Sequence, residues 1–151
     1  MPNKNWWKEI LKQNGISFTK IRETIINILQ NTESHLSAKE IYIIAHKKNK
    51  SIGLTSVYRT LDILTKLGLL HKFEFGDGEA RYELDEKVNN KSHHHHLVCV
   101  RCNKIIDYTD FVKDETDFIN KSEKGLSKIY NFDIKGHMIR FYGFCEKCRD
   151  K

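Results

Sequence analysis

Two Cys-x-x-Cys pairs constrain this chain more than any other feature of its sequence. Cys99 and Cys102 form the first pair, Cys145 and Cys148 form the second, and a run of histidines, His93–His96, directly precedes the first. Two residues between the cysteines allow a tight turn to direct both sulfurs at one ion, and zinc takes four thiolates tetrahedrally. The pairs therefore predict one structural zinc site that closes the intervening chain into a loop.

Redox-active dithiols and disulfides are the competing interpretations, because either needs only pairs of cysteines and no metal. The chain contains 4 cysteines, so two structural pairs use all of them. Residues 1–15 show no long apolar stretch of the kind that a secretory signal carries. We therefore expect a cytoplasmic, reducing location, in which disulfides are rare.

Composition limits the possible classes of protein. The 151 residues, 39% hydrophobic and 11% aromatic, suffice for one domain or two small ones with ordinary cores. No run approaches membrane-spanning length, so no membrane partner is expected. The net charge of +6, more of it in residues 1–84, favours a polyanion partner. Similar charges occur on proteins that bind no nucleic acid, so a motif must support this interpretation.

The first half begins with signals for three helices. Residues 5–14 predict a short helix ended by Gly15, and Thr19 is expected to cap a second helix with an apolar face. Ser37 and Glu40 have the spacing of a capping box at the start of a third.

A fourth helix and a hairpin complete this half. Apolar residues recur at helical spacing from Thr55 until a glycine stops the helix. Leu69–Phe75 and Ala80–Leu84 read as strands around Gly76-Asp77-Gly78, which has the turn chemistry of a hairpin. Together these elements predict a winged helix-turn-helix over residues 1–84.

The outward face of the fourth helix is the candidate DNA surface. Its apolar face must pack inward, which leaves toward solvent the polar set Thr55, Ser56, Tyr58, Arg59, Thr60 and Asp62. Arg59 can pair with a phosphate or a guanine edge, and Tyr58 can contact the backbone or a thymine methyl. An ordinary solvated helix face with Tyr58 half-buried is the alternative.

The second half predicts a small α/β domain. Leu97–Val100 and Ile105–Tyr108 read as strands with the first cysteine pair at their turn. Thr109 or Asp110 is expected to cap a helix, and Phe132–Phe144 to form a long strand that leads to the second pair. Zinc would stabilise a domain of this size, whose own core is marginal.

The histidine run suits a strand better than an expression tag, because it is internal and continues into apolar residues. Side chains alternate along a strand, so His94 and His96 share one face while His93 and His95 share the other. One tract can therefore supply two metal sites.

Three motifs in this order resemble the ferric uptake regulator family: Ser34-His35-Leu36-Ser37-Ala38, Thr55-Ser56-Val57-Tyr58-Arg59-Thr60-Leu61 and His93-His94-His95-His96-Leu97-Val98-Cys99. The resemblance covers nearly the whole chain and implies a homodimeric, metal-dependent repressor that binds double-stranded operator DNA. It also implies an α+β architecture of a winged-helix domain (1–84), a hinge (85–92) and a metal-binding α/β dimerisation domain (93–151).

The resemblance also implies functional residues. The structural zinc would lie on Cys99, Cys102, Cys145 and Cys148. The regulatory metal, Fe²⁺ or Mn²⁺ with Zn²⁺ also possible, would lie on His35, Glu83, His94, His96 and Asp107. A second site would use His93, His95, Asp114 and His137, with Glu115 as an alternative to Asp114. The DNA contacts would be Arg22, Thr55, Ser56, Tyr58 and Arg59.

Two positions depart from the pattern of many family members. Ile21 stands where many carry Gln, before Arg22, so one DNA contact is expected to differ. His95 stands where many carry Asp, and imidazole in place of carboxylate shifts preference away from hard ions toward zinc, nickel or iron.

The implied regulatory ligands come from both halves of the chain. A metal that binds all of them would tie the domains together across the polar hinge and favour one spacing of the recognition helices in a dimer. Glu83 and Arg59 resemble iron-responsive members, which favours control of metal-uptake genes. Asp107 resembles peroxide-sensing members, and zinc sensing is a further alternative within the family.

Proteins of other classes fit less well. The sequence shows no nucleophile motif, phosphate loop or HExxH arrangement, so we expect neither an enzyme nor a small-molecule substrate. A metal chaperone or storage module is the alternative outside the family, because tracts rich in histidine and cysteine also occur simply to bind metal.

Overall fold

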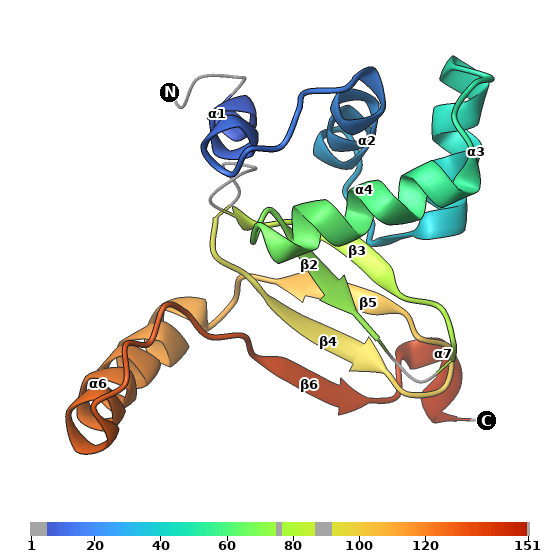
Figure 1. Ribbon diagram of the computed structural model, residues 1–151. Helices are drawn as coiled ribbons and strands as arrows, with labels where there is room; N and C mark the ends of the chain where they lie inside the picture. The colour runs from blue at the N-terminus through green and yellow to red at the C-terminus, as the bar shows by residue number, and fades with distance from the viewer. Residues whose placement is uncertain (1–5, 75–76, 87–91, 151) are drawn as a thin grey trace. The chain divides into compact units, whose positions relative to one another are not determined.

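The computed structural model describes residues 6–74, 77–86 and 92–150, and the chain forms two compact units, Met1–Lys91 and Ser92–Lys151. Each unit contains its own three-stranded sheet, ordered β1-β3-β2 in the first and β5-β4-β6 in the second (Figure 1). Residues 87–91 of the predicted hinge lie outside the described residues. Among the described helices, none combines the length and apolar character needed to cross a membrane.

The first unit consists of four helices and a three-stranded sheet. In chain order its elements are α1 (Trp6–Gln13), α2 (Lys20–Gln30), β1 (Leu36–Ser37), α3 (Ala38–Lys48), α4 (Leu54–Lys66), β2 (Leu70–Phe73) and β3 (Arg81–Leu84). Both strand pairings are antiparallel, and β3 is the central strand. Helices α3 and α4 with the β2–β3 hairpin confirm the predicted winged helix-turn-helix.

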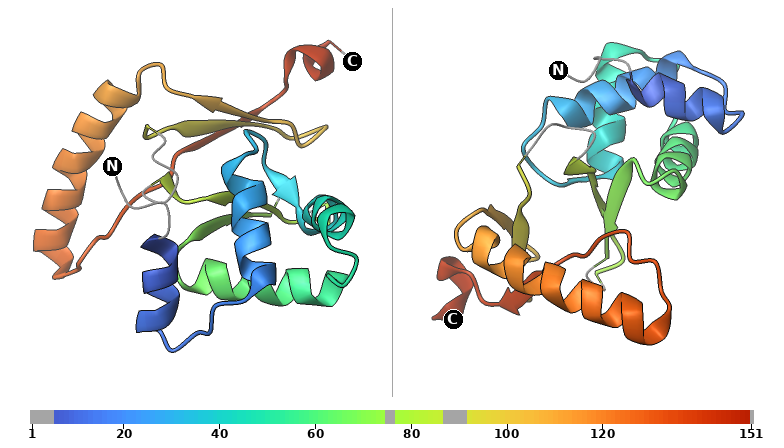
Figure 2. Two further views of the ribbon diagram at one scale, coloured as in Figure 1. Left: turned by 90° about the horizontal axis from the view of Figure 1, so that it is seen from above. Right: turned by 90° about the vertical axis from the view of Figure 1, so that its left-hand side faces the viewer.

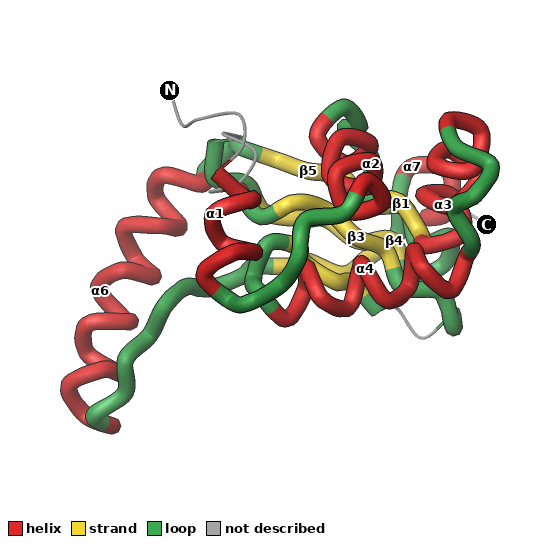
Figure 3. The backbone as a smooth tube through the Cα atoms, turned by 45° about the horizontal axis from the view of Figure 1, so that its top comes forward, coloured by secondary structure: helices red, strands yellow, loops and turns green. Residues whose placement is uncertain are grey.

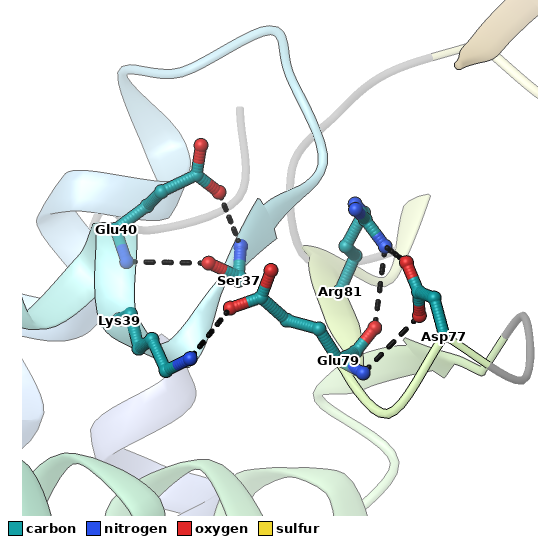
Figure 4. A network of polar contacts seen from close by, with 6 residues as sticks. All are labelled: Ser37, Lys39, Glu40, Asp77, Glu79 and Arg81. Carbon is teal, nitrogen blue, oxygen red and sulfur yellow. Dashed lines mark hydrogen bonds and ion pairs between the residues drawn. The ribbon is translucent and has the colours of Figure 1, made fainter. Parts of the chain in front are cut away.

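Local signals set the helix boundaries in this unit. The Thr19 side chain accepts a hydrogen bond from the Arg22 backbone N–H at 3.3 Å and caps α2. At the start of α3 the predicted capping box is present: the Glu40 N–H donates to Ser37 Oγ at 3.3 Å, and the Ser37 N–H donates to Glu40 Oε2 at 2.8 Å (Figure 4). Gly68, with φ 69°, follows α4 in the left-handed conformation that ends a helix.

One apolar cluster forms the core of the first unit. It joins all four helices to the sheet, with Ile25 of α2, Ile41 of α3 and Leu61 of α4 fully buried. Burial of this kind contributes about 1.5–3 kcal/mol for each large aliphatic side chain. The core thereby fixes the position of the exposed face of α4.

Helix α4 differs from the prediction at two positions. It begins at Leu54, one residue before Thr55. Thr60, which was expected to face solvent, is buried. The reason is helical geometry: Thr60 lies three residues after Val57 and four before Leu64, so it falls within the apolar face.

Polar contacts within the tip of the wing, and one ion pair to the start of α3, hold this segment. The Glu79 N–H and the Arg81 guanidinium both donate to the Asp77 carboxylate at 3.1 Å, and Lys39 pairs with Glu79 at 3.6 Å (Figure 4). The strands are shorter than predicted, and residues 75–76 at the turn lie outside the described residues.

The second unit is built around β4. Its elements are β4 (His95–Cys99), β5 (Ile105–Tyr108), α6 (Val112–Tyr130), β6 (Arg140–Gly143) and α7 (Glu146–Arg149). Strand β4 pairs antiparallel with β5 and parallel with β6, so it is the central strand and carries the histidine run into the first cysteine pair.

Two predicted boundaries in this unit were wrong. The N-cap of α6 is Phe111, with φ 64°, and no side chain caps the helix, so neither Thr109 nor Asp110 has that role. Only Arg140–Gly143 of the predicted long strand is extended and paired, because the pairing partners on β4 are His96–Cys99. The preceding segment, 131–139, runs as a loop back along α6 (Figures 2 and 3).

Candidate metal centres and nucleic-acid interface

The four cysteines form one cluster in the second unit. One Sγ from each of Cys99, Cys102, Cys145 and Cys148 lies within 4.8 Å of all the others. The Cys102 and Cys145 sulfurs are 3.7 Å apart. Zinc–sulfur bonds of about 2.3 Å at the tetrahedral angle separate two sulfurs by about 3.8 Å. The cluster therefore fits a four-thiolate zinc site.

Backbone turns aim the cysteine pairs at one point. After the first pair, the Asn103 N–H donates to the Cys99 carbonyl at 2.9 Å, and Asn103 adopts a left-handed φ of 57°. In the second pair, the Cys148 N–H donates to the Cys145 carbonyl at 2.8 Å as α7 begins. Arg101 joins the two turns by donating to the Cys148 carbonyl at 2.6 Å. Sequence reasoning missed Arg101, because the contact is not local.

Two of the thiols differ strongly in acidity. Backbone N–H donors, first that of Cys145 and then that of Cys102, lower the pKa of Cys99 to about 6. Removal from water and hydrogen bonds to the neighbouring sulfurs raise the pKa of Cys148 to about 12. Zinc ligation needs thiolates, so metal uptake at this cluster is coupled to proton release.

A second cluster contains three imidazoles. One ring nitrogen from each of His93, His95 and His137 lies within 4.8 Å of the others. The His93 and His95 Nε2 atoms are 2.9 Å apart, and His95 is almost completely buried. His93 and His95 lead into and begin β4, while His137 comes from the segment that returns along α6.

Helix α6 brings carboxylates to this cluster. Glu115 Oε2 lies 2.5 Å from His95 Nδ1, whereas Asp114 is exposed. The structure therefore places the alternative residue, Glu115, at the imidazoles. Glu123 Oε1 lies 3.0 Å from His137 Nδ1. Sequence reasoning missed Glu123, although its position eight residues after Glu115 puts both on one face of a helix.

The predicted regulatory ligands of the first unit form a pair. His35 precedes β1 and Glu83 lies on β3, and the antiparallel pairing of these strands brings the two side chains together. His35 Nε2 lies 2.9 Å from Glu83 Oε2. Donor atoms from distant parts of the sequence thus meet where β1 pairs with β3.

The predicted regulatory ligands of the second unit also converge. In the β4–β5 register, His96 is opposite Asp107. The Asp107 carboxylate oxygens lie 3.6 Å from His96 Nε2 and 4.0 Å from His94 Nε2. The ring centroids of His94 and His96 are 4.9 Å apart and those of His93 and His95 are 4.7 Å apart, so alternate histidines of the run lie together.

The exposed face of α4 carries the predicted DNA contacts. Thr55, Tyr58 and Arg59 are exposed, and Ser56 is partly exposed. No side chain caps the N-terminus of α4, so its first-turn N–H groups can approach a phosphate. Arg22 lies on α2, where its guanidinium donates to the Ser17 carbonyl.

Comparisons with known proteins agree with this arrangement. The model of the ferric uptake regulator family matches residues 13–142. The ferric uptake regulation protein of Bacillus subtilis (strain 168) is 37% identical over 145 residues, which cover 95% of this chain and 93% of that protein. The peroxide-responsive repressor PerR of Staphylococcus aureus (strain Mu50) is 28% identical over 141 residues, which cover 93% of this chain and 88% of that protein.

A solved structure is similar over almost the same length. The Helicobacter pylori ferric uptake regulator, whose structure reveals three functional metal binding sites, superposes with a TM-score of 0.72 at 28% identity. The match covers 97% of this chain and 91% of that one.

Proposed function

This chain belongs to the ferric uptake regulator family and is a metal-responsive transcriptional repressor; we propose that Fe²⁺ is its signal and that the metal-loaded homodimer binds operator DNA at metal-uptake genes. The 37% identity to the Bacillus subtilis ferric uptake regulation protein supports iron as the signal.

The observation that carries the proposal is the division of the regulatory ligands between the units. His35 and Glu83 meet in the first unit, and His94, His96 and Asp107 meet in the second. The resemblance implies one metal with donors from both sets, and such a metal would connect the two units. Mixed imidazole and carboxylate donors suit Fe²⁺.

The state in which one metal connects the two units, the joined state, would then be the one that binds DNA. A metal must favour one of two states by about 5.5 kcal/mol to move their ratio from 1:99 to 99:1. Several metal–ligand bonds formed only in the joined state can supply a difference of this size. The metal thereby selects one placement of α4 for the operator.

The surface of α4 supports DNA as the partner. Arg59 and Tyr58 are exposed on a helix whose uncapped N-terminus favours phosphate. Phosphate contacts from such a face position the protein, and contacts to base edges in the major groove supply specificity.

Exposed apolar side chains of the second unit support a homodimer. Phe111, Phe118, Ile129, Tyr130 and Phe132 expose between 65% and 77% of their surface. A unit of this size with so much apolar surface needs a partner to cover it. A second copy provides the same surface in two-fold symmetry, and the symmetry places two recognition helices on two half-sites.

Peroxide sensing is the second candidate, and Asp107 favours it together with the similarity to PerR. In that case Fe²⁺ held by these donors would supply the electron that reduces and cleaves peroxide, the resulting oxidant would oxidise a ligand histidine, His35 or His94, and the metal would be lost. Zinc sensing remains compatible with the same donors.

The test is anaerobic DNA binding at fixed salt to the promoter of the protein's own gene. Protein that retains only its structural zinc receives Fe²⁺, Mn²⁺ or Zn²⁺, and peroxide is then added to the active form. Salt must be fixed because phosphate contacts make affinity steeply salt-dependent. We expect Fe²⁺ to tighten binding most, whereas loss of that effect after peroxide identifies the second candidate.

His35→Ala tests the connection between the units. This variant should keep its four-cysteine zinc and lose metal-stimulated DNA binding. His71→Ala is the matched control, because His71 also pairs with a carboxylate in the first unit, Asp85 at 2.9 Å, and belongs to neither ligand cluster. A normal metal response of His35→Ala would rule out the proposed connection.

A further inference from the structure

A cavity of about 460 Å³ lies within the first unit, between the exposed face of α4 and the wing. Ala38 and Lys39 line it at the start of α3, Tyr58 and Asp62 line it on α4, and the β2–β3 hairpin supplies the remaining lining residues. Sites for small organic molecules typically enclose about 300–1,000 Å³. None of the described residues that line this wing cavity is an implied metal ligand, so metal binding does not account for it.

The wing cavity is lined by more acidic than basic side chains. Four carboxylates and two ammonium groups line it, which gives a formal net charge of −2. The carboxylates are those of Asp62, Glu74, Asp77 and Glu79, and the ammonium groups are those of Lys39 and Lys72. The whole chain carries +6, so the lining has the opposite sign to the protein. A cleft lined by one sign of charge concentrates ligands of the other sign, and here it favours a cation.

Both lysines of the lining already have anionic partners. Lys39 Nζ lies 3.6 Å from Glu79 Oε1 where α3 begins (Figure 4). Lys72 Nζ lies 2.6 Å from Glu74 Oε1. The Asp62 carboxylate, in contrast, forms no ion pair or hydrogen bond with another described residue. An anionic ligand would have to displace a carboxylate from a lysine, whereas a cation can pair directly with Asp62.

The Tyr82 side chain is an independent sign of a ligand. Tyr82 is only 3% exposed and lines the cavity from β3, yet its hydroxyl has no hydrogen-bond partner in the described part of the chain. Burial raises the pKa of this hydroxyl, and the charged groups that also influence it, Lys72, Asp62 and Glu74, all belong to the lining. A buried polar group without a partner costs free energy, and a ligand in the cavity can supply that partner.

Aromatic rings give the cavity further affinity for an organic cation. Tyr58, which is 42% exposed, and Tyr82 both line it. An ammonium group over such a ring is attracted by the negative face of the π system. Ala38, Gly78 and Ala80 add small, uncharged surface that suits alkyl carbons.

The carboxylates are too dispersed to hold a bare metal ion. Among the described residues, no three of them bring oxygen atoms within 4.8 Å of one another, although the candidate metal centres do bring their donors that close. Asp62 lies on α4, whereas Glu74 and Glu79 come from the hairpin. A molecule with two ammonium groups separated by an alkyl chain matches carboxylates on two elements, and each charged pair strengthens its hydrogen bonds.

We propose that the wing cavity is a binding site for an aliphatic diamine or polyamine. One ammonium group pairs with the Asp62 carboxylate and donates to the Tyr82 hydroxyl oxygen, while the alkyl chain lies against Tyr58. A second ammonium group pairs with the carboxylates of the hairpin. The site is separate from the metal centres and needs no metal at the regulatory site.

The experiment measures ligand binding to the zinc-loaded protein in the absence of DNA. Isothermal titration at low, fixed salt compares spermidine and putrescine with Mg²⁺, and NMR of the tyrosine rings locates the ligand. We expect one spermidine per chain, bound about 10-fold or more tightly than Mg²⁺ because the rings attract only the organic cation. The ring signals of Tyr58 and Tyr82 should shift, and those of Tyr130 in the second unit should not.

Two variants remove single groups from the site. Asp62→Asn and Tyr82→Phe should each weaken spermidine binding about 10-fold, because each loses a hydrogen bond to a charged group. Tyr82→Phe keeps the ring and therefore its packing in the core. The matched controls are Glu9→Gln and Tyr42→Phe, which change a carboxylate and a hydroxyl of the first unit outside the lining and should have no effect.

Three results would overturn the inference. The absence of heat and of ring shifts at millimolar spermidine would remove the site. Equal affinity of the parent, Asp62→Asn and Tyr82→Phe would show only diffuse attraction to an acidic surface; Asp62→Asn, whose side chain is exposed, decides this alone should circular dichroism show that Tyr82→Phe is unfolded. Displacement of spermidine by an equal concentration of Mg²⁺ would mean that any cation suffices. No outcome touches the proposed function, which is tested separately by metal-dependent DNA binding.

Discussion

The two units of this chain bury different kinds of side chain. The first unit buries an apolar cluster that joins its four helices to the sheet. In the second unit most of the buried side chains are metal-ligand types, namely His94, His95, His96, Cys99 and Cys148. Only Val98 and Val112 accompany them as buried aliphatic residues among the described part of that unit.

This difference shows how each unit obtains its stability. The hydrophobic effect stabilises the first unit whenever the chain folds, because its driving force is in its own side chains. The second unit exposes its large aromatic residues and buries polar donors, which cost free energy unless they are bonded. Its stability is therefore expected to depend on zinc and on a second copy of the chain.

Removal of the cysteine zinc should give the largest effect. Cys148→Ser, or strong chelation, removes a contribution on the order of 10 kcal/mol from the second unit, since metal binding free energy is folding free energy in such sites. Limited proteolysis should cut within residues 92–151 while the first unit stays resistant. Lys147→Ser, in the same turn, is the control, and an intact second unit without zinc would contradict the comparison.

A cavity in the core of the first unit should destabilise that unit and leave the second unit intact. Leu61→Ala is expected to destabilise that unit by about 2–5 kcal/mol and to leave the zinc content unchanged. Urea unfolding followed by tryptophan fluorescence measures this, because Trp6 and Trp7 are the 2 tryptophans of the chain. The partly exposed Leu54→Ala should stay within about 0.5 kcal/mol of the parent protein.

A substitution on the exposed face of α4 should change DNA binding without changing the stability of either unit. Arg59→Ala is expected to weaken operator binding by about 1–3 kcal/mol with metal uptake intact. Titration at fixed salt measures the affinity, and Lys66→Ala in the last turn of the same helix is the control. A loss of metal uptake in Arg59→Ala would instead mean that Arg59 stabilises the fold.

The smallest expected effect concerns a single helix cap. Ser37→Ala removes one side of the capping box and should cost about 1 kcal/mol, confined to the first unit. Ser37→Thr should retain most of that stability, and Ser34→Ala should have no effect. Unfolding of the first unit by urea measures all three, and an equal loss in Ser34→Ala would mean that the cap is not the cause.

Local signals in the sequence predicted much of the fold. The Ser37 and Glu40 capping box, the Thr19 cap and the glycine after α4 act within a few residues, so their spacing alone determined the helix ends. The alternation of the histidines was equally local, since a strand turns successive side chains to opposite faces.

The errors occurred where a partner distant in the sequence decides the structure. The long strand expected over Phe132–Phe144 is shortened because β4 pairs with only its last part. Thr60 is buried because the first unit needs a wide apolar face on α4. Phe111 occupies the N-cap position of α6 in a left-handed conformation that no propensity of phenylalanine indicates.

The sequence by itself determined the kind of chemistry: two cysteine pairs, a histidine run and a winged-helix pattern point to a metal-responsive repressor, because ligand type and spacing are written in the chain. Only the tertiary structure decided which carboxylates meet which imidazoles. Glu115 and not Asp114 reaches His95, and Glu123 reaches His137, because the phase of α6 and the path of residues 131–139 are set by packing between distant segments.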